Sequence, residues 1–323
     1  MMEDGFGQMK AASRKNNTGD KMSEQSADSA VWLEVAVNGP WSRERQPEIP
    51  ITEDEIVEQA IACAHEGASI IHFHPYDPVT GRQRDAYEIY APVIERVRSK
   101  VDVICYGTLP FAGDVDAKEA MSAEQRFAAV DKLARSGLLE WSVVDPGSTN
   151  ISTRSTLAAG HEGFVYTNPE SHIRHGLELC RHYGLHPSYA IYEPAFMRLG
   201  SELARCYPGV PQPVYRLMFS DTLTFGFPPR VWAIDAYLEL LAEEDPGARW
   251  MVAGLGAEVA PLIDEIVYRG GHVRVGLEDV PMGHKIGNLA QVRDARARIE
   301  AAGGRTATAA DIRQALKAVK VPG

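Results

Sequence analysis

Short runs of β-branched, aromatic and other apolar residues alternate with amphipathic stretches along most of this 323-residue chain. Such runs are typical of strands, and the stretches between them are typical of helices that bury one face. Eight repeats in about 270 residues are the number that makes a (β/α)8 barrel, so the predicted fold class is α/β, a TIM barrel. The expected strands are 31–37, 69–74, 101–106, 140–144, 188–193, 214–219, 249–252 and 272–277, and the expected helices include 53–66, 86–99, 123–136, 230–244, 258–269 and 287–302.

Residues at the expected helix ends support this register. Thr52 precedes an acidic first turn at 53–55, which suits a helix N-terminus and the positive end of its dipole. Gly67, Gly137 and Gly270 fall just past expected helix ends, where a left-handed residue is favoured.

Residues 1–29 are rich in Lys, Asn, Ser, Gly and Asp and have no helical or strand period. They also lack the apolar stretch of a secretory signal. We expect a short disordered N-terminal extension or tag-like arm here, followed by one catalytic barrel domain over residues 30–323.

Composition limits the partners of the chain. Its net charge of -11, with 44 acidic against 33 basic residues, argues against nucleic acid or an anionic membrane. No run approaches the roughly 18 apolar residues of a membrane span. The four cysteines form no CxxC pair and sit in apolar stretches, so we expect reduced core thiols in a cytoplasmic protein that acts on a small molecule.

The strongest chemical signal is the pair His72 and His74 in the second expected strand. Side chains alternate along a strand, so both imidazoles share one face while Ile71 and Phe73 occupy the other. A single strand histidine is more often a hydrogen-bonded core residue than a ligand. Two on one inward face both need buried partners, and this pair predicts metal binding.

The segment 272–279 supplies the complementary groups. Alternation puts Arg274, Gly276 and Glu278 on one face, and Gly276 is expected to leave space for a cavity. Glu278 is the expected third ligand. Asp279 faces the other way and is the expected base, with Arg274 holding it ionised or steadying an enolate oxygen. The alternative is an ion pair inside a barrel layer.

Barrel closure brings these two segments together. The second and eighth strands then lie two positions apart on one rim, and His72, His74 and Glu278 converge at the C-terminal strand ends, where barrel enzymes keep their chemistry. An open sheet would leave them on separate edges. Two histidines and a carboxylate suit Zn²⁺ or Fe²⁺, and we favour zinc.

Weaker features surround the same rim. Glu193 ends the fifth strand and either contacts substrate or pairs with a barrel lysine or arginine. Asn38 follows the first strand and is expected to overlook the cavity. Gly254 and Gly256 follow the seventh strand and would let backbone amides approach a cofactor phosphate.

With the HxH of strand two and the RxGxED of strand eight in an eightfold chain, the sequence resembles the β-keto acid cleavage enzyme family, from about residue 35 to 318. This resemblance implies a zinc-dependent exchange: a β-keto acid and acetyl-CoA give acetoacetate and the CoA ester of the remaining acyl fragment. No redox cofactor is implied. The matching segments are 38–39, 50–52, 67–68, 71–74, 192–193, 252–254, 270–274, 278–279 and 284–285.

The resemblance also implies roles for particular residues. At matching positions, His72, His74 and Glu278 would hold zinc. Arg274 and Asp279 would form the dyad that removes a proton from the keto acid.

Two loops depart from the family pattern. Where the family commonly has Ser-Thr-Gly-Gly after strand three, this chain has Tyr106 and Thr108 in a different loop. After strand four the usual Leu-Asn is replaced by a pair that ends in Asp145. We expect these three residues and Glu193 to contact substrate. We expect the extra charge at Asp145 either to disfavour an acidic substrate tail and favour a cationic one, or to be neutralised by a neighbouring group.

Two other functions use the same residues. One is a metal-dependent aldolase or hydrolase that needs no CoA, and the other is a non-catalytic barrel that binds a small acid. Dependence on CoA separates the first from the leading hypothesis. We also expect a homo-oligomer, since barrels of this kind often associate.

Overall fold

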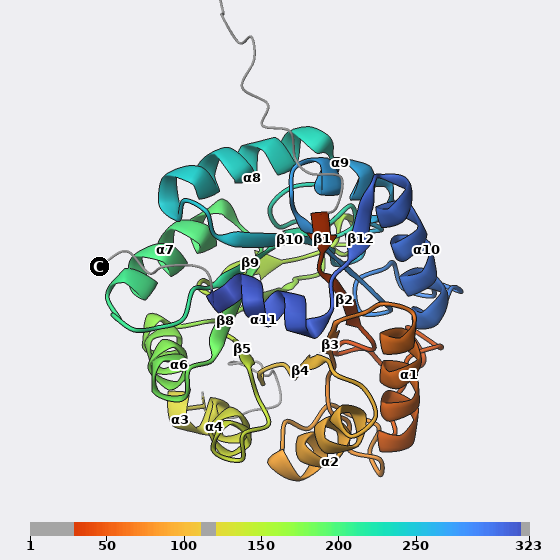
Figure 1. Ribbon diagram of the computed structural model, residues 1–323, viewed down its shortest axis with the longest axis vertical. Helices are drawn as coiled ribbons and strands as arrows, with labels where there is room; N and C mark the ends of the chain where they lie inside the picture. The colour runs from red at the N-terminus through yellow and green to blue at the C-terminus, as the bar shows by residue number, and fades with distance from the viewer. Residues whose placement is uncertain (1–28, 111–120, 318–323) are drawn as a thin grey trace, which may run out of the picture.

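The computed structural model describes residues 29–110 and 121–317, and these form one eight-stranded parallel sheet surrounded by helices (Figure 1). The pairing order is β4-β3-β2-β11-β10-β9-β8-β5. The two end strands of this order, β4 and β5, follow one another in the chain and lie side by side, so the sheet is nearly closed and the predicted TIM barrel is confirmed. The strands are β2 (Leu33–Ala36), β3 (Ile70–His72), β4 (Ile104–Tyr106), β5 (Trp141–Val143), β8 (His186–Ile191), β9 (Val214–Phe219), β10 (Arg249–Gly254) and β11 (His272–Val275).

The six expected helices are all present, most within a residue or two of their predicted ends. The stretch 123–136 is divided at Phe127 into two helices, and the stretch 258–269 begins with a 3-10 turn, η1 (Ala260–Leu262). Two further helices, α6 and α7, complete the ring around the sheet. The helices are α1 (Glu53–His65), α2 (Tyr87–Arg98), α3 (Ala123–Arg126), α4 (Ala128–Arg135), α6 (Glu170–Tyr183), α7 (Pro194–Arg205), α8 (Val231–Glu244), α9 (Ile263–Tyr268) and α10 (Asn288–Ala301).

The predicted helix ends are confirmed. Thr52 accepts a hydrogen bond from the Glu55 amide while the Glu55 side chain accepts one from the Thr52 amide, which is a complete capping box. Gly67, Gly137 and Gly270 all have positive φ, between 68° and 109°, as expected for residues that end helices.

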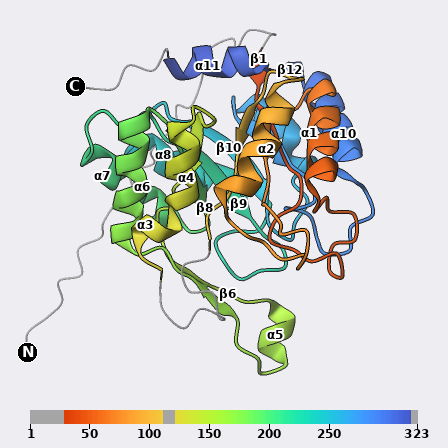
Figure 2. The same ribbon diagram turned by 90° about the horizontal axis from the view of Figure 1, so that it is seen from below.

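Elements outside the repeat lie at the two ends of the barrel (Figure 2). At the N-terminal end of the strands, β1 (Ser29–Val31) pairs with β12 (Gly304–Thr306), and α11 (Ala309–Lys317) lies across the barrel axis. At the opposite end, an arm projects from the barrel after β5. It consists of β6 (Thr149–Ile151), α5 (Arg154–Ala158) and β7 (Phe164–Tyr166), with β6 and β7 antiparallel.

The cysteines are free thiols, as predicted, but one of them is not in the core. Cys63, Cys105 and Cys180 are buried, whereas Cys206, the residue that ends α7, is exposed. The expectation for the leader falls on residues 1–28, which lie outside the described residues. Within the described ranges, none of the helices is both long and apolar enough to cross a lipid bilayer.

His272, the first residue of β11, contacts Trp32, the residue just before β2. Its Nδ1 accepts a hydrogen bond from the Trp32 amide at 3.2 Å, and its ring stacks on the Trp32 indole at 4.1 Å between centroids. Burial and the nearby charge of Arg249 lower the pKa of His272 to about 3. The folded protein therefore holds this imidazole neutral.

We expect the free energy of unfolding to decrease as the pH falls below 6.5, because unfolded His272 takes up a proton that the folded state refuses. This residue contributes up to about 1.4 kcal/mol per pH unit. Urea unfolding between pH 7 and pH 5 measures the slope for the wild type and for His272→Asn, which keeps an acceptor for the Trp32 amide. The unfolding free energy of the variant should depend less steeply on pH, by the slope that corresponds to the uptake of about one proton. Equal slopes would contradict this assignment.

Candidate active site

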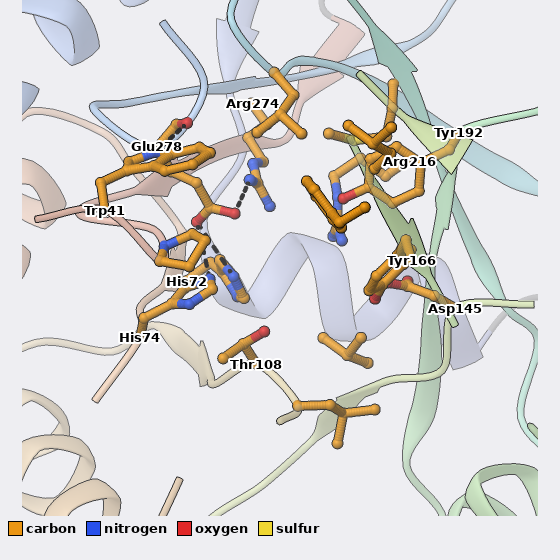
Figure 3. Close-up of a pocket in the computed structure, with 17 residues that line it drawn as sticks. Trp41, His72, His74, Thr108, Asp145, Tyr166, Tyr192, Arg216, Arg274 and Glu278 are labelled. Carbon is orange, nitrogen blue, oxygen red and sulfur yellow. Dashed lines mark hydrogen bonds and ion pairs between the residues drawn. The ribbon is translucent and has the colours of Figure 1, made fainter. Parts of the chain in front are cut away.

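A cavity opens at the C-terminal ends of the barrel strands (Figure 3). The arm projects from the same end of the barrel (Figure 2). His72, His74, Glu278 and Arg274 line one side of it, with Trp41 at their edge. Leu109, Val143, Met218 and Leu255 contribute apolar lining. The predicted convergence of strands two and eight is therefore present in the structure.

The three expected ligands form a compact cluster. One ligand atom from each lies within 4.8 Å of the others. Glu278 Oε2 is 3.4 Å from His72 Nε2 and 3.5 Å from His74 Nε2. Ligand atoms bound at about 2.0–2.1 Å to a tetrahedral zinc would lie about 3.4 Å apart. The spacing fits such an ion.

Unsatisfied polar atoms point to the same conclusion. His74 Nε2, Glu278 Oε2 and His72 Nδ1 are buried and have no hydrogen-bond partner among the described residues. A buried polar atom without a partner carries a desolvation cost. Two of these atoms face one point, and a cation there would satisfy both. The donor set fits a divalent metal.

Electrostatics favours the protonation states that metal binding requires. Burial holds the pKa of His72 well below its usual range, so the imidazole is neutral. Burial alone would raise the pKa of Glu278, but Arg274 and the two imidazoles outweigh it and hold that pKa well below its usual range. A neutral imidazole and an ionised carboxylate are the ligand forms.

Two backbone features set the position of the ligands. Gly39 has φ +69°, and a Cβ there would come within 2.6 Å of Glu278 Cγ, so glycine leaves room for the ligand side chain. Asn38 donates to the carbonyl of His74 and accepts from its amide. Asn38 is fully buried and does not line the cavity, so here it holds the backbone of a ligand.

Gln83 fixes the orientation of His74. Its Oε1 lies 2.8 Å from His74 Nδ1, which leaves Nε2 directed at the ligand cluster. Gln83 Nε2 in turn donates to Asp85, and Tyr90 donates to the same carboxylate. Asp77, in the loop after β3, caps a turn by accepting from the amides of residues 79 and 80.

Arg274 bridges three carboxylates and is 1% exposed. Its guanidinium donates to both oxygens of Asp279 at 2.6–3.1 Å and lies 2.8 Å from Glu278 Oε1. It also reaches Glu34 at 3.4 Å. Burial raises the pKa of Asp279 against the opposing charge of Arg274. Arg274 lines the main cavity and also a second one beside η1 and α10, whereas Asp279, behind Arg274, lines only the second.

Gly276 plays a different part from the one we expected. A Cβ there would come within 2.2 Å of the Ala36 carbonyl, and its φ is +136°. Strand β11 ends at Val275, so Gly276 lets the turn pass against β2 rather than leaving space in the cavity.

A buried polar layer forms the floor of the cavity. The Tyr106 hydroxyl donates to Glu34 at 2.7 Å and accepts from Arg216 at 2.7 Å, and Arg216 also donates to Ser188. The Tyr106 ring lies 4.7 Å from that of His72. Tyr106 is therefore beneath a ligand, outside the lining residues. Its contact with substrate stays a prediction.

Of the other residues expected to contact substrate, two line the cavity and one lies outside its lining. Thr108 and Asp145 line the cavity. Glu193 lies outside that lining, at the start of α7, and its Oε1 accepts from Thr149 and from the Gly226 amide.

Gly254 and Gly256 also lie outside the cavity lining and form a tight turn. A Cβ at either residue would come within 2.2 Å of a protein oxygen atom. The amides of Leu255 and Ala257, on either side of Gly256, are already bonded to protein carbonyls. The phosphate contact stays a prediction.

Sequence reasoning missed several groups at the cavity. Arg216 is the clearest, because an arginine between Tyr215 and Leu217 in an apolar strand signals a buried charged layer. Tyr166 and Tyr192 also line the cavity. Tyr166 is on the arm, whose path no periodic pattern encodes.

The family model for the β-keto acid cleavage enzyme matches residues 30–317 of the chain. The chain belongs to the β-keto acid cleavage enzyme family. The predicted recognition is confirmed, and with it the prediction of an enzyme that cleaves a carbon–carbon bond by acyl transfer.

Similar proteins agree with this assignment. A 3-dehydrocarnitine:acetyl-CoA trimethylamine transferase of Rhizobium meliloti (strain 1021) is 25% identical over 313 residues, covering 91% of this chain and 99% of the relative. A 3-keto-5-aminohexanoate cleavage enzyme of Fusobacterium nucleatum subsp. nucleatum is 25% identical over 240 residues, 74% of this chain and 78% of the relative. The apo structure of ObcA matches with a TM-score of 0.68 and 16% identity, and the match covers 84% of this chain and 66% of the ObcA chain. At this identity the match supports the fold alone.

Removing divalent metal should lower the melting temperature by about 5 °C or more, because an ion that binds only the folded state stabilises it. One equivalent of Zn²⁺ should restore it. Thermal melts with metal analysis measure the effect in the wild type, in His74→Ala, and in the control His186→Asn, which changes a histidine bonded to the Gln212 carbonyl. A full zinc response in His74→Ala would contradict the ligand set.

Gln83→Leu should weaken zinc binding about 10–100-fold, since it removes the acceptor that orients His74. Competition with a chromogenic chelator measures the affinity. Gln125→Leu, in the capping box of α3, is the control and should bind zinc normally. Unchanged affinity in Gln83→Leu would show that the imidazole is oriented by other contacts.

Proposed function

We propose that this protein is a zinc-dependent β-keto acid cleavage enzyme that uses acetyl-CoA as its acyl partner. The β-keto acid R–CO–CH2–COO⁻ and acetyl-CoA would give acetoacetate and R–CO–SCoA, a reaction that balances without a redox cofactor. The observation that carries the proposal is the cluster of His72, His74 and Glu278 beside Arg274, at the rim of a barrel that belongs to the β-keto acid cleavage enzyme family. Three relatives have names that pair acetyl-CoA with an acid substrate.

His72, His74 and Glu278 would hold the ion. When bound, zinc supplies Lewis-acid polarisation of a carbonyl oxygen, which lowers the cost of removing the neighbouring proton. The two carboxylate oxygens of Glu278 have different partners. Oε1 faces Arg274, and Oε2 faces the imidazoles. Two imidazoles and a carboxylate with an open position suit zinc, and metal analysis of the purified protein distinguishes zinc from Fe²⁺, which the same donor set also suits.

Arg274 and Asp279 would act as one unit in proton transfer. Arg274 would take up the proton from C2 of the keto acid as it passes one of its own N–H protons to Asp279, so that the proton ends on a carboxylate that does not itself line the cavity. Because Arg274 faces the cavity and Asp279 lies behind it, Arg274 is also placed to steady the negative oxygen of the enolate.

Carbon–carbon exchange follows in two steps. C2 of the enolate attacks the acetyl carbonyl and forms a new C–C bond as the CoA thiolate leaves. The thiolate then attacks the original ketone carbon, the bond between that carbon and C2 breaks, and C2 takes back the proton from Asp279. Leu109, Val143, Met218 and Leu255 keep water from competing with the thiolate.

The remaining parts of the proposal concern the setting of the enzyme. The acidic net charge and free cysteines support a cytoplasmic protein. We also propose a homo-oligomer, in keeping with the tendency of such barrels to associate. Small-molecule partners are the keto acid and acetyl-CoA, with Thr108 and Asp145 contacting the acid.

Incubation of the zinc-loaded protein with acetyl-CoA and a panel of β-keto acids should release acetoacetate. Rates should fall by at least about 100-fold in Asp279→Asn and in His72→Ala, because one loses the base and the other a ligand. Acetoacetate and the new thioester are measured by chromatography, with His186→Asn as the control. Turnover of the acid without CoA would replace this function with that of an aldolase or hydrolase.

A further inference from the structure

A chain of hydrogen bonds joins the expected ligand His74 to Thr108, and both residues line the cavity (Figure 3). Gln83, Asp85 and Tyr90 lie between them, outside that lining. His74 Nδ1 is 2.8 Å from Gln83 Oε1, and Gln83 Nε2 donates to Asp85 Oδ2 at 2.7 Å. The Tyr90 hydroxyl donates to Asp85 Oδ1 at 2.7 Å and accepts from the Thr108 amide at 3.2 Å. The Asp85 carboxylate is therefore the centre of the chain.

Asp85 determines which end of the Gln83 side chain faces His74. An ionised carboxylate only accepts hydrogen bonds, so the group that Gln83 directs at Asp85 has to be its NH2. The carbonyl oxygen of the same amide then faces His74, and because it also only accepts, His74 has to carry its proton on Nδ1. His74 Nε2 keeps its lone pair and is buried with no hydrogen-bond partner among the described residues. This is the tautomer that a metal ligand needs.

The charge of Asp85 makes this order of donors unique. Each of its two oxygens accepts a hydrogen bond from a neutral donor, and bonds to an ionised acceptor are about twice as strong as bonds between neutral groups. Burial raises the pKa of Asp85, and the hydrogen bonds from Tyr90 and Gln83 oppose that shift. An amide in the same place could direct its own NH2 at Gln83, which would let Gln83 present an NH2 to His74 instead.

The other branch of the chain positions the loop after β4. Because Asp85 accepts the Tyr90 proton, the hydroxyl oxygen is left to accept from the Thr108 amide. The loop backbone also packs on the Tyr90 ring, since a Cβ at Gly107 would come within 2.1 Å of a ring carbon. Tyr90 lies on α2 and is buried. One tyrosine thus holds a residue of the cavity lining against a helix of the barrel.

We propose that Asp85 is a positioning residue for the proposed reaction. Through Gln83 it selects the metal-binding tautomer of His74, and through Tyr90 it holds Thr108 at the cavity. Asp85 lies outside the cavity lining, so it acts through these neighbours and not on substrate. The inference rests on the proposed metal site and the proposed cleavage, and its first test needs neither substrate nor turnover.

The first test measures the tautomer and the metal affinity. Long-range proton–nitrogen NMR spectra of zinc-free protein with isotope-labelled histidine distinguish Nδ1–H from Nε2–H at about pH 8, where imidazoles are neutral. The signal that His74→Gln removes is that of His74. We expect Nδ1–H in the wild type and a mixture of both tautomers in Asp85→Asn. Zinc affinity, measured by competition with a chromogenic chelator, should fall about 10–100-fold in Asp85→Asn.

A double variant separates the order of donors from packing. In Gln83→Glu combined with Asp85→Asn, the carboxylate and the amide exchange places and the net charge is kept. The carboxylate at position 83 only accepts, so His74 again carries its proton on Nδ1, while the amide at position 85 donates to that carboxylate and accepts from Tyr90. The two positions share one hydrogen bond, so their effects are not additive, and zinc affinity should return to within about threefold of the wild type.

Tyr90→Phe tests the second branch. It keeps the ring against Gly107 and removes the hydroxyl between Asp85 and the Thr108 amide. With zinc saturating, KM for the keto acid should rise about fivefold or more while kcat changes little, because a displaced Thr108 weakens the binding of substrate and transition state alike.

Asp245→Asn is the matched control for these variants. Asp245 also accepts from a tyrosine hydroxyl, that of Tyr215, but lies outside the cavity lining. Its zinc affinity, KM and kcat should equal those of the wild type.

The outcomes separate this inference from the function beneath it. Nε2–H on His74 in the wild type, unchanged zinc affinity in Asp85→Asn, or a double variant no better than the single one would overturn the role of Asp85. Unchanged KM in Tyr90→Phe would overturn the Thr108 branch. If Asp85→Asn does not fold, the wild-type spectrum and the double variant still decide. Absence of acetoacetate from every acid with the wild type would count against the proposed function and leave the tautomer and zinc results standing.

Discussion

The contacts of Arg274 with three carboxylates are the interaction on which the site depends. The guanidinium joins Glu34 on β2 to Glu278 and Asp279 in the turn after β11. Each of these charges would be costly to bury alone, and removing one partner of such a group commonly costs about 3–5 kcal/mol. Arg274 and the three carboxylates therefore hold one another in position. By engaging Glu278 Oε1, Arg274 also determines that Oε2 faces the two imidazoles.

The periodic parts of the fold and site were predictable for a physical reason. Extended backbone has a two-residue period, and the chain keeps His72 and His74 on one face although β3 ends at His72. Parallel pairing of β2 with both β3 and β11 brings the distant Glu278 to the same rim. The alternation of strand and helix patterns predicted the barrel. These predictions depend on periodic patterns along the chain, and the folded protein keeps the secondary structure that those patterns predict.

Predictions failed or stayed incomplete where the chain leaves that period. The alternation that placed Glu278 was extended past Val275, where β11 ends, and the reason given for Gly276 was wrong because the residue lies in a turn with positive φ. Asp279 was expected to face away from the ligands, and it does lie behind Arg274. Tyr166 could not be placed, since the fold of the arm depends on contacts far away in sequence.

Attachment of the arm to the barrel explains how Tyr166 keeps its position in the cavity lining. Ser152 and Thr224 exchange hydrogen bonds, and residue 153 bridges residue 223, so the arm is tied to the loop after β9. Tyr166 is tied again through Asp145. The expected metal ligands have no part in these contacts, and they depend instead on Arg274, Gln83 and Asn38. Substitutions in the arm can therefore move Tyr166 in the cavity lining while the cluster around Arg274 keeps its geometry.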